Sequence, residues 1–438
     1  MIDVAEIKIW GELLGAVRWD VQKQLASFQY DKKFLTRGFD LSPIKMPIKN
    51  GNRIYNFPEL RKEKDEQIDT FKGLPGLLAD TLPDKYGNQL MNVWLAQNGR
   101  SVNSLNPVEQ LCFIGTRGMG ALEFEPAQFK SNKKTFAIEI KSLIEAAQKM
   151  LSNRKDLKES LQKNEQKAMS EILKIGTSAG GARPKAVIAY NKKTGRVRSG
   201  QTIAPKGFEH WLLKLDGVSN VQFGISHGFG RVEYAYYLMA KDCRIDMMDS
   251  ELLEENSRAH FMTKRFDREG SNTKHHIQTF CGISHFDYNN LYSYSYEQLF
   301  QTMRTLRLTY PESEQMFRRM VFNVMAVNYD DHTKNFSFRL KQKGKWELSP
   351  AYDVCYSYDP DNIWVNQHSL SINGKNKDIN KSDLKTIALT NNIKKWEKII
   401  EEIKDIVCNW EEYADKVRVS SKLKNKIKEN LIALKFRK

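Results

Sequence analysis

Cysteine and histidine are scarce in this sequence, and their scarcity excludes several classes of protein. The 438 residues include five cysteines, scattered and without a C-x-x-C pair, and eight histidines. An odd number of separated cysteines argues against a disulfide scaffold or a structural zinc site, and favours a reducing, cytoplasmic location. Eight histidines leave little material for a histidine-rich metal site.

Long apolar runs are also missing. No apolar run reaches the roughly 18 residues that a membrane-spanning helix needs. The first residues, MIDVAEIKIWGELLG, lack a basic segment followed by an apolar one, so we expect no signal peptide. The sequence therefore predicts a cytoplasmic protein that does not enter a membrane.

Positive charge is in excess. The chain has 69 Lys and Arg against 53 Asp and Glu, a formal net charge of +16. This surplus favours polyanionic partners such as nucleic acid, nucleotide phosphates or anionic lipid. The alternative is that lysines only solvate helix faces and hairpin turns. The last segment, SSKLKNKIKENLIALKFRK, has the pattern of a basic amphipathic helix.

Three regions follow one another along the chain, and we expect domains at 1–125, 126–268 and 269–438. The first is mixed, with two strands around a glycine turn in IKIWGELLGAVRW and a helix from about Asp84 to Asn98-Gly99. In the second, residues 174–268 predict an antiparallel sheet with one inserted helix, GRVEYAYYLMAKDC, after a polar stretch at 152–167. Helices dominate from Tyr296 onward. This order predicts an α+β fold.

The stretch VNYDDHTKNFSF, residues 327–338, is dense in polar groups between two structured elements. Asp330 precedes Asn335 by five positions, the separation found in the kinase catalytic loop H-R-D-x-x-x-x-N. There a carboxylate faces the attacking hydroxyl, and an amide oxygen faces the magnesium ion that clamps the phosphates. The alternative is an Asx-rich turn whose side chains cap neighbouring elements.

Asp353, in LSPAYDVCYSYD, follows a short predicted strand, WELS. Kinases place a second magnesium-binding acid, that of D-F-G, on a strand-to-loop junction after the catalytic loop. The sequence YDV is not D-F-G, so position and order alone support this role. The alternative is an ordinary turn or helix-capping aspartate.

The segment LKIGTSAGGARPKAVIAY predicts a strand, a glycine-rich loop and a second strand. Gly180 and Gly181 allow the backbone to approach a phosphate closely, although the loop matches no standard phosphate-binding motif. It could equally be a plain glycine hairpin, and Ser178 inside it could be modified.

Lys214, in HWLLKLDG, lies on a predicted strand, with Trp211 and Leu213 on the opposite face. Kinases reach the α/β-phosphates from such a lysine, and Glu233 on the next helix could pair with it. The alternative is an exposed edge lysine.

In this order, the motifs resemble those of the HipA toxin kinases of bacterial toxin–antitoxin pairs, over most of the chain. The stretches that carry the resemblance are LPGLLADTLPDKYGNQL, SAGGARPKA, WLLKL, RFDR (265–268), VNYDDHTKNFSF and LSPAYDV. The resemblance implies a two-lobed fold like that of protein kinases and phosphoinositide kinases. Its N-terminal lobe is mixed, with an antiparallel sheet, and its C-terminal lobe is mostly helical.

The resemblance also implies roles for individual residues. Asp330 would be the catalytic acid, with His332 beside it, and Asn335 and Asp353 would hold Mg²⁺. Ser178 would be the autophosphorylated residue. Contacts to ATP would come from Ser178, Gly180, Gly181, Ala182, Lys214, Glu233, Lys264 and Phe266, the last two at the adenine hinge.

The family's partners are implied in the same way. They are a HipB-like DNA-binding antitoxin, operator DNA reached through it or through the basic surface, and a protein substrate such as an aminoacyl-tRNA synthetase. The expected biology is growth arrest. Arg183-Pro184 in the glycine-rich loop, the polar stretch at 152–167 and the basic tail depart from the family pattern.

Three other functions stay open at this point. A phosphoinositide or small-molecule kinase would keep the same site but change the acceptor. A catalytically degenerate, DNA-bound scaffold or corepressor would use the basic surface. A metal hydrolase built on Asp330, Asp331 and His332 is disfavoured, because the sequence shows no second His/Asp cluster.

Overall fold

The computed structural model describes residues 2–61, 69–101, 104–127, 137–152, 176, 183–201, 203–217, 228–342 and 344–436. The chain separates into two compact units. The first comprises Met1–His227, Leu253–Ile277 and Lys341–Lys343, and the second comprises Gly228–Leu252, Gln278–Leu340 and Gly344–Lys438. The three domain ranges expected from the sequence stay a prediction.

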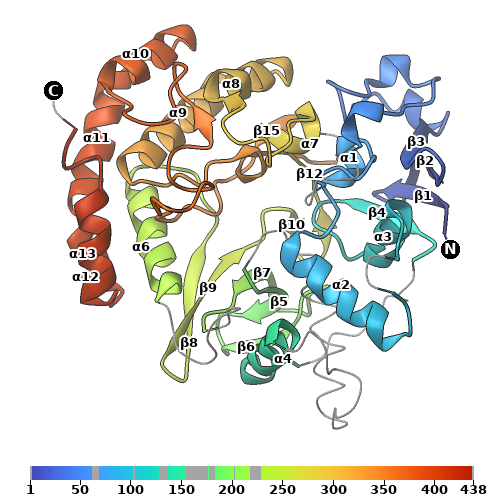
Figure 1. The fold of residues 1–438 in the computed structure, drawn as a ribbon, viewed down its shortest axis with the longest axis horizontal. Helices are drawn as coiled ribbons and strands as arrows, with labels where there is room; N and C mark the ends of the chain where they lie inside the picture. The colour runs from blue at the N-terminus through green and yellow to red at the C-terminus, as the bar shows by residue number, and fades with distance from the viewer. Residues whose placement is uncertain are drawn as a thin grey trace. The chain divides into compact units, whose positions relative to one another are not determined.

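The first unit begins with a four-stranded antiparallel sheet in the order β3-β2-β1-β4 (Figure 1). Alternate residues of β1 are buried, as expected for a strand with one face on a core. The two strands predicted around a glycine turn are confirmed as β1 and β2, with Gly11 at a φ of +80° between them. The strands are β1 (Val4–Ile9), β2 (Glu12–Asp20), β3 (Leu25–Tyr30) and β4 (Leu122–Glu125).

Short helices follow the third strand. The predicted helix is confirmed as α2, which begins after Asp84 and ends at Gln97. Gly99, at a φ of +70°, takes the left-handed conformation that commonly ends a helix. The helices are η1 (Phe34–Thr36), η2 (Ile48–Asn50), η3 (Pro58–Leu60), α1 (Gly76–Ala79), α2 (Lys85–Gln97), α3 (Pro107–Ile114) and α4 (Ile140–Ser152).

A five-stranded sheet in the order β6-β5-β7-β9-β8 confirms the sheet predicted within 174–268. The printed pairings β5–β6, β5–β7 and β7–β9 are all antiparallel. The inserted helix is α6 (Phe229–Asp242), which belongs to the second unit. The strands are β5 (Lys185–Asn191), β6 (Arg196–Ser199), β7 (Glu209–Lys214), β8 (Ser250–Glu255) and β9 (Arg258–Lys264).

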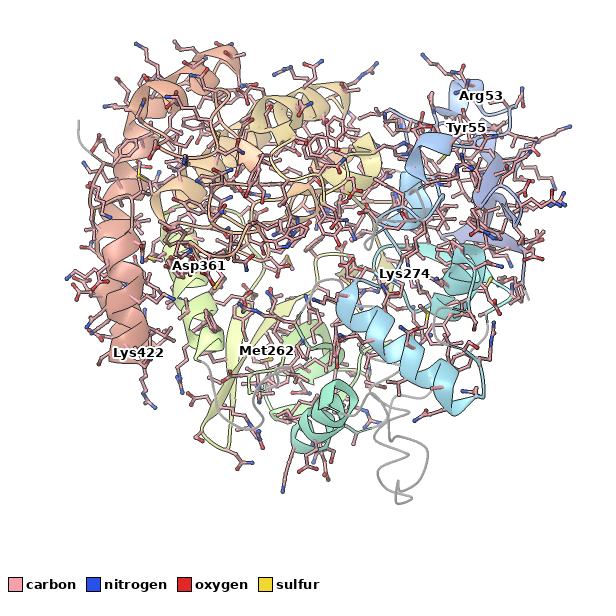
Figure 2. All side chains as sticks on the ribbon, viewed as in Figure 1. Arg53, Tyr55, Met262, Lys274, Asp361 and Lys422 are labelled. Atoms are coloured by element: carbon pink, nitrogen blue, oxygen red, sulfur yellow. The ribbon has the colours of Figure 1, made fainter. Side chains whose placement is uncertain are left out.

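Helices α2 and α4 share one hydrophobic core with this sheet. Trp211 and Leu213 of β7 are both buried in it, as expected for two residues predicted on the same face of the strand. Met262 of β9 belongs to the same core and is labelled in Figure 2. Other members are Tyr86 and Leu90 of α2 and Leu143 and Ile144 of α4.

The glycine-rich loop, with Ser178, Gly180, Gly181 and Ala182, lies outside the described residues, as do residues 153–175 of the polar region. The strand predicted before this loop also lies outside the described residues, and Gly176, predicted as the first residue of the loop, is helical. A Cβ atom at this position would lie 2.6 Å from the Leu90 side chain. The glycine thus packs directly against α2.

The second unit is mostly helical, as predicted from Tyr296 onward. Helix α9 lies at its centre and is buried from Met316 to Met325. Tyr236 of α6 donates a hydrogen bond to the Ala326 carbonyl at 2.6 Å and packs against Trp410. The helices besides α6 are α7 (Phe280–Ser284), α8 (Tyr296–Thr305), α9 (Tyr310–Met325), η4 (Thr333–Asn335), α10 (Lys381–Thr390), α11 (Trp396–Cys408), α12 (Trp410–Lys416) and α13 (Ser421–Asn430).

Short strands complete the chain. The predicted strand WELS is confirmed as β15 (Trp346–Leu348), which joins β12 (His276–Thr279) and β14 (Ser337–Leu340) in the order β12-β14-β15. Two small pairs are β10 (Arg268–Glu269) with β11 (Thr273–Lys274), and β13 (Tyr294–Ser295) with β16 (Leu370–Ser371).

The basic tail forms α13, shorter than its sequence pattern suggests. Two of its lysines are paired with acids of α12: Lys424 with Asp415 at 2.7 Å, and Lys428 with Glu411 at 2.5 Å. Part of its charge is therefore matched within the protein. Within the described part of the chain, the search for a helix long and apolar enough to cross a bilayer finds none.

Candidate functional site

The loop 327–338 leaves the end of α9 and is fixed at its start by backbone pairing. Tyr329 donates its N–H to the Ser357 carbonyl at 3.2 Å, and Ser357 donates to the Val327 carbonyl at 3.1 Å. Val327 is buried and has a φ of +55°. This conformation is unusual for a β-branched residue and marks a backbone that its surroundings hold in place.

Asp330, His332 and Asn335 lie together in this loop. The Asn335 side-chain amide donates a hydrogen bond to the Asp330 carbonyl at 2.5 Å. His332 Nε2 lies 3.6 Å from Asp330 Oδ1, and His332 Nδ1 accepts the N–H of Lys334 at the start of η4. The Asp330 side chain is 43% exposed, so an external group can reach its carboxylate.

Asp331 points into the protein instead. Its side chain is fully buried, and its two oxygens accept hydrogen bonds from the Tyr296 hydroxyl at 2.9 Å, His368 Nδ1 at 2.8 Å and the Ser369 N–H at 2.8 Å. Because both oxygens are engaged by the protein, Asp331 anchors the loop. Among the described residues, no group of three or more His, Cys, Asp or Glu could hold a metal ion. A hydrolase centre on Asp330, Asp331 and His332 therefore gains no support.

Asp353 lies in the segment after β15 and has a φ of +52°. The preceding backbone is anchored by a hydrogen bond from the Ala351 N–H to the Asp246 carbonyl at 2.7 Å. The Tyr352 hydroxyl donates to the Lys334 carbonyl at 2.7 Å. This bond ties the Asp353 segment directly to the loop that carries Asp330.

Asn335 and Asp353 line one pocket within the second unit. The Asn335 amide nitrogen is engaged with Asp330, which leaves its oxygen as the candidate metal ligand. One amide oxygen and one carboxylate are the oxygen donors that Mg²⁺ prefers, and Mg²⁺ usually completes its shell with water and substrate phosphates. The predicted pair of residues therefore fits a magnesium ion.

The same pocket contains residues that sequence reasoning missed: Arg319, Asn323 and Asn328. Arg319 and Asn323 stand four residues apart on α9, and so on one helix face. Burial lowers the pKa of Arg319 to about 10, so its guanidinium stays charged at neutral pH. Asn323 accepts from Asn328 at 2.9 Å and donates to the Tyr296 hydroxyl at 3.0 Å. The available signal in the sequence was the four-residue spacing of Arg319 and Asn323 inside the mostly apolar segment FRRMVFNV.

Lys214 lies at the end of β7 in the first unit, with its ammonium 5.6 Å from the centre of the Phe261 ring. Its cross-strand partner on β5 is Lys185, which is 3% exposed and was not singled out in the sequence. Like charges directly opposite each other are unfavourable unless other groups balance them. Glu233 is buried on α6 in the second unit, and its pairing with Lys214 stays a prediction.

The two residues expected at the adenine hinge lie at the end of β9, with Lys264 as its last residue and Phe266 two positions later. Lys264 forms an ion pair with Glu209 of the neighbouring strand β7. Phe266 is half-buried between two buried residues, Arg265 and Asp267. The ATP-contacting roles of Lys264 and Phe266 stay a prediction.

Comparison with protein families identifies the family of this chain. Residues 5–125 match the HipA N-terminal domain, and residues 177–410 match the HipA-like C-terminal domain. The second match alone spans more than half of the chain. The chain therefore belongs to the HipA family, as its motifs predicted.

Solved structures agree with this fold. The chain is similar to one from the complex of HipA, HipB and operator DNA of the Shewanella oneidensis MR-1 toxin–antitoxin system, with a TM-score of 0.69. The two share 17% sequence identity over 99% of this chain and 98% of that one. The likeness confirms the predicted α+β fold, and the division into two kinase-like lobes stays a prediction.

A weaker likeness is found to the proinflammatory kinase CtkA of Helicobacter pylori, with a TM-score of 0.34 and 14% identity. It covers 52% of this chain and 91% of that one. A search of the curated proteins finds no match.

Proposed function

We propose that this chain is an ATP- and Mg²⁺-dependent serine/threonine protein kinase that acts as the toxin of a toxin–antitoxin pair. One observation carries the proposal: Asn335 is bonded to the Asp330 backbone and lines the same pocket as Asp353. Asp330, whose side chain is 43% exposed, is therefore bonded through its backbone to one of two oxygen donors suited to a metal ion. Membership of the HipA family supports an enzyme of the kinase type.

Phosphoryl transfer requires positioning and charge neutralisation more than covalent chemistry. Asp330 would align the serine or threonine hydroxyl and accept its proton. Asn335 and Asp353 would hold Mg²⁺, which neutralises the phosphate oxygens when bound. Lys214, with Lys185 opposite it, would attract the α/β-phosphates of ATP. Asp331 keeps Asp330 and Asn335 in register through its buried hydrogen bonds.

Partners and regulation follow from the family and belong to the same proposal. The similar chain comes from a structure that contains HipB and operator DNA, which supports a HipB-like antitoxin and indirect contact with DNA. An aminoacyl-tRNA synthetase is the proposed substrate, and phosphorylation of it would arrest growth. Ser178 is the proposed site of autophosphorylation.

The direct test is transfer of label from radioactive ATP with Mg²⁺ to the protein itself. Asp330→Asn keeps the shape of the side chain but removes its charge, and we expect the rate to fall about 100-fold, as for other positioned acid–base groups. Asp415→Asn is the matched control, because this exposed carboxylate lies on α12 and pairs only on the surface. It should label like the wild type.

Equal labelling of wild type and Asp330→Asn would refute the role of Asp330. No label on the wild type, with normal ATP binding, would instead favour a catalytically inactive scaffold on DNA. That alternative predicts DNA binding that weakens steeply with salt and needs no ATP turnover.

Ser178 is tested separately by mass spectrometry after incubation with ATP. We expect one phosphate on the peptide 175–185 of the wild type and none on Ser178→Ala. A dianionic phosphate beside Arg183 and Lys185 would form charge-assisted hydrogen bonds that rearrange the loop. An unmodified wild-type peptide, in a protein that labels other sites, would refute this assignment alone.

A further inference from the structure

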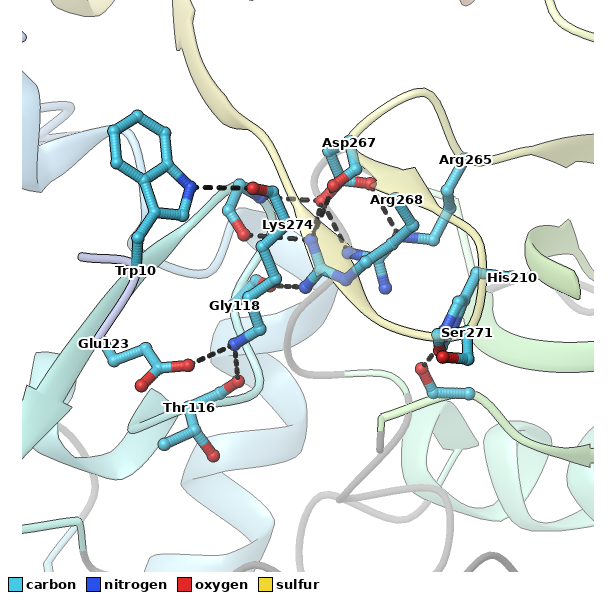
Figure 3. A network of polar contacts seen from close by, with 12 residues as sticks. Trp10, Thr116, Gly118, Glu123, His210, Arg265, Asp267, Arg268, Ser271 and Lys274 are labelled. Carbon is cyan, nitrogen blue, oxygen red and sulfur yellow. Dashed lines mark hydrogen bonds and ion pairs between the residues drawn. The ribbon is translucent and has the colours of Figure 1, made fainter. Parts of the chain in front are cut away.

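A fully buried carboxylate, Asp267, lies in the hinge segment, which we define as residues 264–268. Its two oxygens accept four hydrogen bonds (Figure 3). Two come from Arg265, at 2.8 and 2.7 Å, and one from Arg268, at 2.6 Å. The fourth comes from the backbone N–H of Gly120, at 2.7 Å, and Gly120 lies 147 residues earlier in the chain.

The charges of this cluster make the carboxylate hard to replace. Burial alone would raise the pKa of Asp267, but Arg265 and Arg268 hold it well below its ordinary value. Burial lowers the pKa of Arg268 to about 10. Asp267 and Arg268 are therefore both charged at neutral pH. Loss of the single carboxylate would leave two buried cations facing each other.

The partner of the hinge segment is a loop of the N-terminal domain, residues 116–123, which we call the clasp loop. Arg268 donates hydrogen bonds to the carbonyls of Gly120 at 2.9 Å and Gly118 at 3.1 Å. Gly120 has a φ of +77°, and a Cβ atom there would lie 3.3 Å from the backbone nitrogen of Ile277. Glycine thus permits both the turn and the close approach.

A second set of contacts joins the N-terminal domain to the strand pair that follows the hinge segment. Lys274 of β11 donates to the Thr116 carbonyl at 2.9 Å and pairs with Glu123 at 2.6 Å. The Trp10 indole donates to the Lys274 carbonyl at 2.7 Å. These bonds, drawn in Figure 3, join β11 to the clasp loop and to Trp10.

We propose that the N-terminal HipA domain helps to form the nucleotide site, because its clasp loop holds the hinge segment in place through Asp267. This inference rests on the proposed function. On the sheet side, the Arg265 N–H donates to the His210 carbonyl at 2.9 Å. Phe266 is thus held between two anchored neighbours and presents a fixed backbone to an adenine ring. Asp267 is a positioning residue, since it acts through this backbone.

The test measures the dissociation constant of a fluorescent ATP analogue and, separately, kcat at saturating ATP, on the full chain. If only one molecule in ten has a binding-competent hinge segment, the apparent affinity for the nucleotide falls about tenfold. We expect this loss for Asp267→Asn. Lys274→Met removes only the outer contacts, so it should fold and weaken binding about threefold by the same relation. In both variants kcat should stay within about twofold of the wild type, because the loop of Asp330 is untouched.

Lys8→Gln is the control. It breaks the 2.6 Å ion pair with Glu125 in the same N-terminal sheet, but it removes none of the bonds that Lys274 makes to Thr116 and Glu123. Wild-type affinity for Lys8→Gln, with weaker binding for Lys274→Met, would support the inference even if Asp267→Asn fails to fold. Equal dissociation constants for the wild type and Lys274→Met would overturn this inference but not the proposed function. A wild type that does not bind the nucleotide would overturn the proposed function as well.

Discussion

Replacement of Asp331 by asparagine tests how the loop of Asp330 is held. An ionised carboxylate only accepts hydrogen bonds, so Tyr296, His368 and Ser369 all donate to it. An asparagine offers one acceptor oxygen in place of two. In its best orientation it keeps the two donors on one side and turns its own NH₂ group toward the Ser369 N–H.

The cost can be worked from these contacts. One buried N–H left without an acceptor costs about 1–3 kcal/mol, and two hydrogen bonds that lose their charged acceptor weaken by about 1 kcal/mol each. Asp331→Asn should therefore lower the free energy of unfolding by about 3–5 kcal/mol. That is a large share of the roughly 5–15 kcal/mol that stabilises a typical protein.

Urea unfolding at neutral pH measures this loss, with Asp361→Asn as the control. Asp361 is exposed on the segment between Asp353 and His368 (Figure 2), so its replacement should change stability by less than about 0.5 kcal/mol. The transfer rate of folded Asp331→Asn should also fall, because Asp330 and Asn335 lose their anchor. A loss of less than about 1 kcal/mol would refute the anchoring role of Asp331.

Three further predictions concern other residues. Burial lowers the pKa of His276 to about 3, against 6.5 for the free side chain. Protonation therefore favours the unfolded chain, and the stability that neutral His276 contributes, complete above pH 6.5, is lost as the pH falls toward 3. Between pH 7.5 and 5, the free energy of unfolding should fall by about 2 kcal/mol less in His276→Gln than in the wild type. Gly120→Ala should cost at least about 1–2 kcal/mol in the same urea assay, because an L side chain is strained at its positive φ. Lys395→Gly should raise the free energy of unfolding by about 0.5 kcal/mol, seen as a slightly higher thermal midpoint, because this exposed residue precedes α11 at a φ of +55°.

Much of the fold could be predicted because burial follows the sequence pattern closely. Alternation in β7 and helical periodicity in α2 reflect one buried face each. The sequence DSELLEEN gave no such signal, since β8 lies at the edge of its sheet and is only partly buried. The segment WEKIIEEIKDIVCNW carries no glycine or proline at the boundary between α11 and α12, although α11 ends at Cys408.

The site could be predicted only where spacing along the chain carries the chemistry. Asp330 and Asn335 are five residues apart, and their mutual bond is local. The supporting contacts join distant segments: Asp331 meets His368 across 37 residues, and Asp267 meets Gly120 across 147. No periodicity reports such pairs, because each partner taken alone is an ordinary buried polar residue.

The polar cluster DDHTKN combines a candidate reacting group with the side chains that position it. The exposed fraction separates these roles: Asp330 is 43% exposed, His332 19% and Asp331 not at all. The oxygens of the buried Asp331 carboxylate already accept three hydrogen bonds from the protein, whereas the Asp330 carboxylate can be reached from outside. Two adjacent aspartates therefore differ in their surroundings, since Asp331 is turned into the protein and Asp330 toward solvent. The same reasoning applies to RFDR, where Arg265 and Asp267 turn inward and leave Phe266 between them.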